Sequence, residues 1–135
     1  MAYSSIKRTE GGFQKLVFEN VVDTLAGGLI LDLDGYEDAV EGFVPAGTLV
    51  GIDKDTGLGK VVKITPATEG GEEEDPTDAS FDIEPIGLTI RNSEVNDNTV
   101  VGVVISGTAR IAALPTKESD NADAIAKALP RITLV

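Results

Sequence analysis

The 135-residue sequence contains no cysteine, no histidine and no tryptophan, and its aromatic residues are limited to four phenylalanines and two tyrosines. Without cysteine there can be no disulfide bond and no thiolate metal site. Without histidine the chain has neither the commonest general base nor the commonest zinc ligand. Carbohydrate-binding and base-stacking surfaces usually need more aromatic side chains than this, so both kinds of binding protein are disfavoured. We therefore expect a protein that is not an enzyme and that has no cofactor and no metal site.

Positive charge is also scarce, because 11 basic residues face 23 acidic ones and the net charge is −12. A field of that sign repels nucleic-acid phosphates and anionic membrane surfaces, so we expect neither as a partner. No apolar run approaches the roughly 18 residues of a membrane span. The N-terminus has no apolar stretch typical of a signal peptide, so synthesis in the cytoplasm is expected.

Residues 1–13 differ in composition from the rest of the chain. They are polar, carry Lys7 and Arg8 against the single acid Glu10, and end in a Gly-Gly dipeptide before Phe13. This pattern predicts a flexible N-terminal arm on a glycine hinge. It is either a frayed terminus or an arm that orders on a partner. In the second case the candidate binding residues are Tyr3, Ile6, Lys7, Arg8 and Phe13.

Residues 14–135 are of a length typical of one domain. Short stretches rich in apolar and β-branched residues alternate with glycine and proline turns, which predicts eight or nine short strands. Such a count favours a mainly β fold, a small barrel or sandwich with one short helix near the C-terminus. A first strand is expected from residue 14 onward, and the others at 29–33, 48–52, 60–64, 81–90, 99–106, 108–114 and 131–135.

The stretch 66–80 contains an acidic run at 72–75 between a Gly-Gly pair and Pro76. It has too few apolar side chains to order itself by burial, so a mobile acidic loop on the outside of the domain is expected.

One helix is expected at 120–129, where small and apolar residues recur at i, i+3, i+4 and i+7. Asp120 or Asn121 would cap its first turn, and Pro130 would end it. Its apolar face has two interpretations, namely packing on the chain's own barrel or contact with another subunit. The residues concerned are Ala122, Ile125, Ala126 and Leu129.

Two binding motifs fail on inspection. Residues 53–57 open like a calcium loop, but the sixth position is Leu58 and the twelfth is Ile64, where glycine and a bidentate glutamate are required. Residues 57–60 resemble the end of a phosphate-binding loop, but Lys54 and Val61 occupy positions that need glycine and Ser or Thr. Neither a calcium site nor a nucleotide site is predicted.

Several segments occur in an order that resembles tailed-phage head decoration proteins. They are FVPAGTLVGI at 43–52, the hairpin return at 60–64, PIGLT at 85–89 and TVVGVVISGTAR at 99–110. Over roughly residues 14–114 the chain resembles the lambda-type capsid stabilisation (cement) proteins, and also the head fibre and auxiliary capsid proteins of phages. Segment 66–80 has no counterpart in that family.

The resemblance implies a virion protein that sits as a homotrimer on the outer capsid surface, at three-fold or quasi-three-fold points, and binds the major capsid protein. In that family an N-terminal arm orders against the capsid, often by adding a strand. Residues 3–13 occupy the corresponding place in this sequence.

Two other functions stay open at this stage. One is a head fibre or host-surface attachment module, to which Tyr3, Tyr36 and Phe43 would contribute an aromatic or polar pocket. The other is a tail-tube or connector subunit, which would form six-fold rings.

Overall fold

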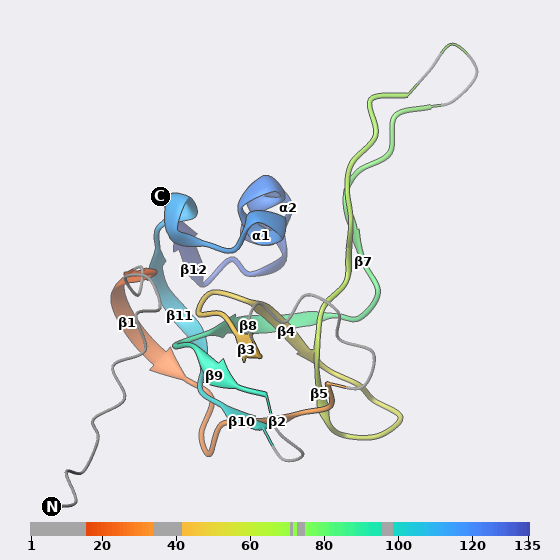
Figure 1. Ribbon diagram of the computed structural model, residues 1–135. Helices are drawn as coiled ribbons and strands as arrows, with labels where there is room; N and C mark the ends of the chain where they lie inside the picture. Colours follow the sequence, from red (N-terminus) through yellow and green to blue (C-terminus); the bar gives the residue numbers. More distant parts are fainter. Residues whose placement is uncertain (1–15, 34–41, 71, 73–74, 96–98) are drawn as a thin grey trace, which may run out of the picture.

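The computed structural model describes residues 16–33, 42–70, 72, 75–95 and 99–135. It confirms a mainly β fold, a curled sheet with few helices (Figure 1). The strands are β1 (Phe18–Thr24), β2 (Leu29–Leu31), β3 (Phe43–Val44), β4 (Leu49–Ile52), β5 (Gly59–Val61), β6 (Ile64–Thr65), β7 (Ser80–Phe81), β8 (Pro85–Thr89), β9 (Ser93–Glu94), β10 (Thr99–Val101), β11 (Val103–Ala109) and β12 (Ile132–Leu134). The helical elements are the 3-10 turn η1 (Ile111–Ala113) and the helices α1 (Thr116–Asp120) and α2 (Ala122–Ala128).

The main sheet runs in the order β1-β11-β8-β4-β5-β2-β10, and β12 adds to β11. Strands β10 and β11 are separated only by Gly102, and a short turn joins β1 to β2. In this arrangement β11 pairs with β1 and β10 pairs with β2, both in antiparallel fashion. Because β10 stands at one end of the strand order and β11 near the other, this continuity curls the sheet into a half-barrel.

Two apolar clusters lie on opposite faces of this sheet. In β4, neighbouring side chains point to opposite faces, so Leu49 belongs to one cluster and Val50 to the other. The cluster inside the curl comprises Leu29, Leu31, Val44, Val50, Val101 and Val103. The cluster between the sheet and the helical layer comprises Val17, Ala46, Leu49, Val62, Leu88, Ala109, Leu114, Ile125, Leu129 and Ile132. Helices α1 and α2 lie together on one side of the sheet, next to β12 (Figure 1).

Strand β11 is the centre of the fold. One of its edges pairs with β1, and the other pairs first with β8 and then, from Gly107, with β12 in parallel. The strands predicted at 99–106 and 108–114 are wrong in their division, because β11 continues through Gly107 to Ala109 and residues 111–113 form η1. The β1–β11 register is irregular next to Val21, the partner of Gly107. A side chain at Gly107 would collide with the carbonyl oxygen of Asn20, so glycine is needed for the close approach of β1.

The single helix predicted at 120–129 is wrong in its boundaries. The chain forms two short helices, which meet at Asn121, where φ is −116° and ψ is 26°. The predicted side-chain cap is also wrong, because neither helix has a capping hydrogen bond from a side chain. The Asn121 side chain instead donates to the carbonyl of Lys117 over 2.8 Å, and so closes the end of α1.

The segment predicted as an acidic loop is more regular than expected in its described part. Strands β6 and β7 pair in antiparallel fashion, and further out Thr68 and Thr77 exchange backbone hydrogen bonds of 2.9 and 3.0 Å. Figure 1 shows the described residues of segment 64–81 projecting from the rest of the domain as a hairpin. We call it the acidic hairpin.

Candidate interaction surface

The residues predicted to form a binding arm lie outside the described residues, so their role stays a prediction. They are Tyr3, Ile6, Lys7, Arg8 and Phe13. Tyr36, proposed for an attachment pocket, lies outside them as well, whereas Phe43 is described and is 44% exposed. Leu16, two residues before the start of β1, is apolar and 66% exposed.

The four helix residues considered for a subunit contact divide into two groups. Ala122, Ile125 and Leu129 are buried within the chain itself, and the last two belong to the cluster beneath the helical layer. Only Ala126 is exposed. Packing within the chain therefore accounts for three of the four side chains. Those three are not available for contact with another subunit.

Strand β1 is the most exposed strand of the main sheet. Six of its seven residues are exposed, and Val21 and Val22 place apolar side chains in solvent. It pairs with β11 along one edge, and the described part of the chain supplies no strand to its other edge. An unpaired edge presents free backbone N–H and C=O groups and is a template for another strand. Figure 1 shows β1 at the margin of the sheet.

The two charged side chains of β1 are both acidic and form ion pairs within the chain. Glu19 lies 2.8 Å from Arg110, and Asp23 lies 3.5 Å from Arg131. All four side chains are about half exposed, so each pair adds little to stability, on the order of 0–1 kcal/mol. Each acid of β1 is therefore paired with an arginine of the same chain, so the two pairs leave little unbalanced acidic charge on the strand.

A second apolar feature lies on the outer face of β2 and β10. Ile30 and Val100 are direct cross-strand partners and are 48% and 57% exposed. Their neighbours along the strands point into the curl and are buried, as the two-residue period of a strand requires. This pair is therefore an exposed apolar spot on an otherwise ordinary strand face.

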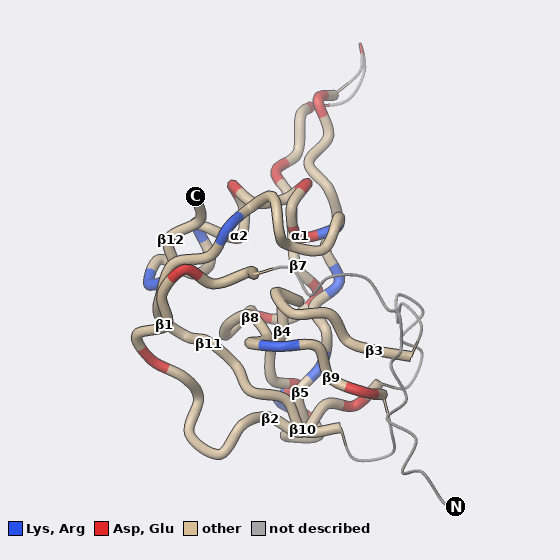
Figure 2. The backbone as a smooth tube through the Cα atoms, turned by 60° about the vertical axis from the view of Figure 1, so that its left-hand side comes forward, with Lys and Arg blue, Asp and Glu red and all other residues tan. Residues whose placement is uncertain are grey.

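The acidic hairpin carries charge of one sign only. Residues 64–81 include six acidic residues and no lysine or arginine. Glu69, Glu72, Asp75 and Asp78 are described and exposed, and Figure 2 shows acidic positions along the projection. At its base the Lys63 N–H donates to Asp82 over 2.8 Å, which ties the start of the hairpin to its end.

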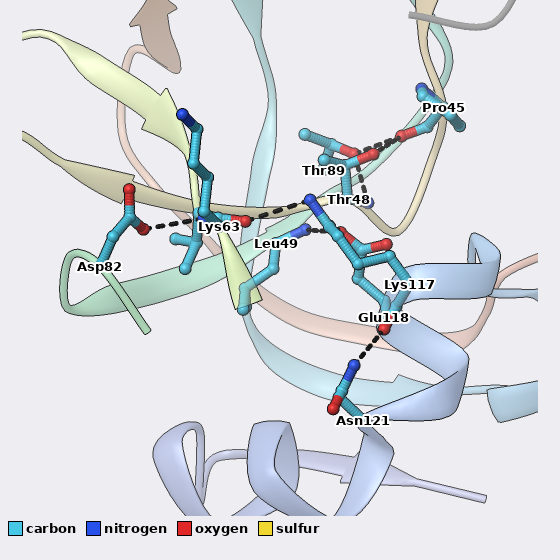
Figure 3. A network of polar contacts seen from close by, with 10 residues as sticks. Pro45, Thr48, Leu49, Lys63, Asp82, Thr89, Lys117, Glu118 and Asn121 are labelled. Atoms are coloured by element: carbon cyan, nitrogen blue, oxygen red, sulfur yellow. Dashed lines mark hydrogen bonds and ion pairs between the residues drawn. The ribbon is translucent and has the colours of Figure 1, made fainter. Parts of the chain in front are cut away.

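A buried polar contact joins the helical layer to the sheet (Figure 3). Glu118 in α1 is 1% exposed, accepts a hydrogen bond from the Leu49 N–H, and lies 3.7 Å from the ammonium group of Lys117. Lys117 also donates to the carbonyl of Val62 over 3.1 Å. Burial raises the pKa of the Glu118 carboxyl, and the charge of Lys117 partly opposes that rise. The contact fastens α1 to β4.

A second polar group in Figure 3 fixes the turn before β4. The carbonyl of Pro45 accepts hydrogen bonds from the hydroxyls of Thr48 and Thr89, at 2.7 and 2.8 Å. The Thr89 hydroxyl oxygen in turn accepts from the Thr48 N–H at 3.0 Å. Both threonines are buried, so these bonds satisfy groups that water cannot reach. This group and the Glu118 contact have a structural role, and no local pattern in the sequence predicted either of them.

Among the described residues, no three acidic side chains lie close enough together to hold a metal ion. None of the described helices has the length and apolar character needed to cross a membrane. Comparison with known proteins found no match among family models, curated proteins or solved structures. The described residues present three surface features that a partner could contact, namely the edge of β1, the pair on β2 and β10, and the acidic hairpin.

Proposed function

We propose that the protein is a structural virion component that binds the outside of a phage capsid and stabilises it by bridging major capsid subunits. The observation that carries the proposal is the N-terminal part of the chain, namely residues 1–13 and the strand β1 that follows them. A basic segment leads directly into β1, a seven-residue strand whose second edge has no partner among the described residues. A basic segment beside an unpaired edge is suited to strand addition with a partner protein.

The proposed mechanism needs no catalysis. A ligand that binds only the assembled shell stabilises it in proportion to occupancy, so each bound copy would oppose the dissociation of neighbouring capsid subunits. A homotrimer would present three N-terminal segments at once. Multivalent attachment of this kind multiplies weak individual contacts into firm binding. The acidic composition of the rest of the chain would keep the free protein soluble at high concentration.

The test uses purified capsids of the phage whose genome encodes the chain. Full-length protein and a variant lacking residues 1–13 are each sedimented with capsids, and bound protein is quantified. We expect binding by the full-length protein and at least about a tenfold loss for the truncated one, equivalent to about 1.4 kcal/mol. A variant in which residues 67–78 are replaced by Asn-Gly is the control, since it changes a remote surface and should still bind.

Three outcomes separate the possibilities. Equal binding by the truncated protein excludes the role of the N-terminal segment, and no binding by the full-length protein excludes the capsid role itself. Native mass spectrometry of the free protein tests the assembly. A three-subunit species supports the proposal, whereas a six-subunit ring supports a tail-tube or connector subunit instead.

A further inference from the structure

Helix α1 is held to the sheet by polar contacts rather than by apolar burial. Of its five residues, only Glu118 is buried. Among the described residues that form or line the two apolar clusters, none comes from α1. Helix α2 differs, because its Ile125 is fully buried in the cluster beneath the helical layer. The attachment of α1 therefore depends on hydrogen bonds.

Two hydrogen bonds join α1 to the sheet at neighbouring points. Oε1 of Glu118 accepts from the Leu49 N–H at 3.2 Å (Figure 3), and the Lys117 ammonium group donates to the Val62 carbonyl at 3.1 Å. Leu49 and Val62 are also bonded to each other, since the Val62 N–H donates to the Leu49 carbonyl at 2.9 Å. Lifting α1 would break its own two bonds and leave this backbone bond within the sheet in place.

The backbone on both sides of α1 has the form of a joint. Pro115, before the helix, is extended with ψ 153°, and Asn121, after it, has φ −116° and ψ 26°. Beyond these joints, Leu114 and Ala122 are buried and fix the chain to the rest of the fold. A short segment between two buried anchors, without apolar burial of its own, is the kind of unit that opens locally while the remaining structure stays folded.

The charge of Lys117 is the one that faces the Glu118 carboxyl, at 3.7 Å from the same helix. The other elements packed against α1 offer little, because β4 and η1 contain no titratable residue. The remaining charged residues of the surrounding segments are exposed, namely Asp120 in α1, Asp123 and Lys127 in α2, and Lys63 beside Val62. Burial therefore raises the pKa of the Glu118 carboxyl, and Lys117 opposes this only in part.

Lifting α1 would return the carboxyl to water and to its ordinary pKa of 4.5. The closed form therefore binds the Glu118 proton more tightly than the open form does. The ratio of open to closed form is lowest below pH 4.5. It then rises by up to about tenfold per pH unit, and it levels off once the pH has passed the raised value of the closed form.

We propose that α1 is a pH-sensitive latch, closed on β4 while Glu118 carries its proton and released from the sheet when the carboxyl ionises. Release bares the Leu49 N–H and the Val62 carbonyl, while Ile125 keeps α2 in the cluster beneath it. The latch goes beyond the proposed capsid role, because it lies in the helical layer and requires neither residues 1–13 nor a partner.

Amide hydrogen exchange of the full-length protein, resolved by residue with NMR, tests the latch. Observed rates are compared with intrinsic rates at each pH to give protection factors. Above pH 4.5 we expect the Leu49 N–H to be at least about tenfold less protected than the Val62 N–H, which reports the pairing of β4 instead. Leu49 protection should fall by up to about tenfold per pH unit. It should not respond to low urea concentrations, since lifting five residues exposes little surface.

Two variants separate Glu118 from other titrating groups. Glu118→Gln keeps an acceptor for the Leu49 N–H but cannot ionise, so Leu49 protection should lose its dependence on pH. Asp120→Asn removes an exposed carboxyl of the same helix and should leave that dependence unchanged. Circular dichroism checks that both variants are folded. In the unaltered protein, the carbon-13 resonance of the Glu118 carboxyl should titrate above pH 4.5, which tests the latch without any substitution.

Three results would overturn the inference. Equal protection of Leu49 and Val62, with the same response to urea, would mean that α1 separates only when the whole domain unfolds. Leu49 protection that stays constant with pH in the unaltered protein would mean that ionisation does not release the helix. The same pH dependence in Glu118→Gln as in the unaltered protein would mean that another group controls the opening.

Discussion

The Leu49 N–H donates a hydrogen bond of 3.2 Å to Oε1 of Glu118, and this bond fastens α1 to β4. The carboxyl is buried, and burial raises its pKa above the ordinary value of 4.5. The folded chain therefore binds the Glu118 proton more tightly than the unfolded chain does. The contribution of this group to stability is fully present below pH 4.5 and is lost as the pH rises through the raised folded pKa.

We predict that Glu118→Gln makes stability less dependent on pH. The amide oxygen of glutamine still accepts from Leu49, but the amide cannot ionise, so the loss of stability as the pH rises above 4.5 should shrink. Urea unfolding at several pH values measures this. Asp120→Asn, at an exposed position in the same helix, is the control and should leave the pH dependence unchanged. An unaltered pH profile in Glu118→Gln would show that the carboxyl does not titrate in this range.

Removing the acceptor altogether has a different predicted effect. Glu118→Ala leaves the buried Leu49 N–H without a partner and opens a cavity beneath α1. We expect a loss of about 1–3 kcal/mol from the unsatisfied donor at every pH, with an additional cost from the cavity. Chemical denaturation of this variant beside Glu118→Gln separates the hydrogen bond from the ionisation. Equal stability of the two variants would contradict the assignment.

The turn that contains Gly47 is predicted to tolerate no side chain. Gly47 has φ 85°, and an added methyl group would lie 2.8 Å from Leu114 Cδ2 and 3.1 Å from Val17 Cγ1. Gly47→Ala should therefore lose about 1–2 kcal/mol from the left-handed backbone and about 1–3 kcal/mol more from overpacking. Gly57→Ala has φ 74° with no atom within 4 Å, so only the backbone cost should appear. Thermal unfolding of both variants should rank Gly47→Ala as the less stable, and equal losses would contradict the packing.

Most strands could be predicted from the sequence, because their evidence is local. Glycine and proline turns and short β-branched stretches placed strands near β2, β4, β8 and β10, and the structure has them there. Their pairing could not be predicted. The parallel contact between Leu31 and Gly59, and the division of one edge of β11 between β8 and β12, depend on residues far apart in the chain. No periodicity within a single segment encodes such a choice of partner.

The helical layer shows where sequence periodicity is misleading. The spacing from Ala122 to Leu129 correctly indicated an apolar face, but α1 was missed, because the buried side chain that anchors it is a glutamate. Charged residues are rarely buried, so a pattern built on apolar spacing assigns Glu118 to the surface. The Leu49 N–H that makes its burial possible is 69 positions away in the sequence.

The buried threonine group before β4 is predicted to be sensitive to loss of a hydroxyl. Thr89→Val keeps the shape of the side chain, but it removes one donor to the Pro45 carbonyl and the acceptor of the Thr48 N–H. The unsatisfied N–H should cost about 1–3 kcal/mol. Thr133→Val at an exposed position of β12 is the control and should stay within about 0.5 kcal/mol of the parent. Urea unfolding measures both, and similar values for the two variants would contradict the role of the hydroxyl.

The acidic hairpin is predicted to be dispensable for folding. An isolated two-stranded ribbon is marginally stable by itself, and beyond β6 and β7 no described residue of this hairpin belongs to either core cluster. Replacement of residues 67–78 by Asn-Gly would leave the pairing of Ile64 with Phe81 intact while removing six of the 23 acidic residues. We expect the unfolding free energy to change by less than about 1 kcal/mol, since surface changes away from the core have small effects.

Ile64→Ala in the full-length chain is the comparison, because Ile64 packs against the cluster beneath the helical layer. This substitution should lower the unfolding free energy by more than the shortening of the hairpin does. If the shortened variant instead loses most of its unfolding free energy while Ile64→Ala stays close to the parent, the acidic hairpin contributes to the stability of the sheet.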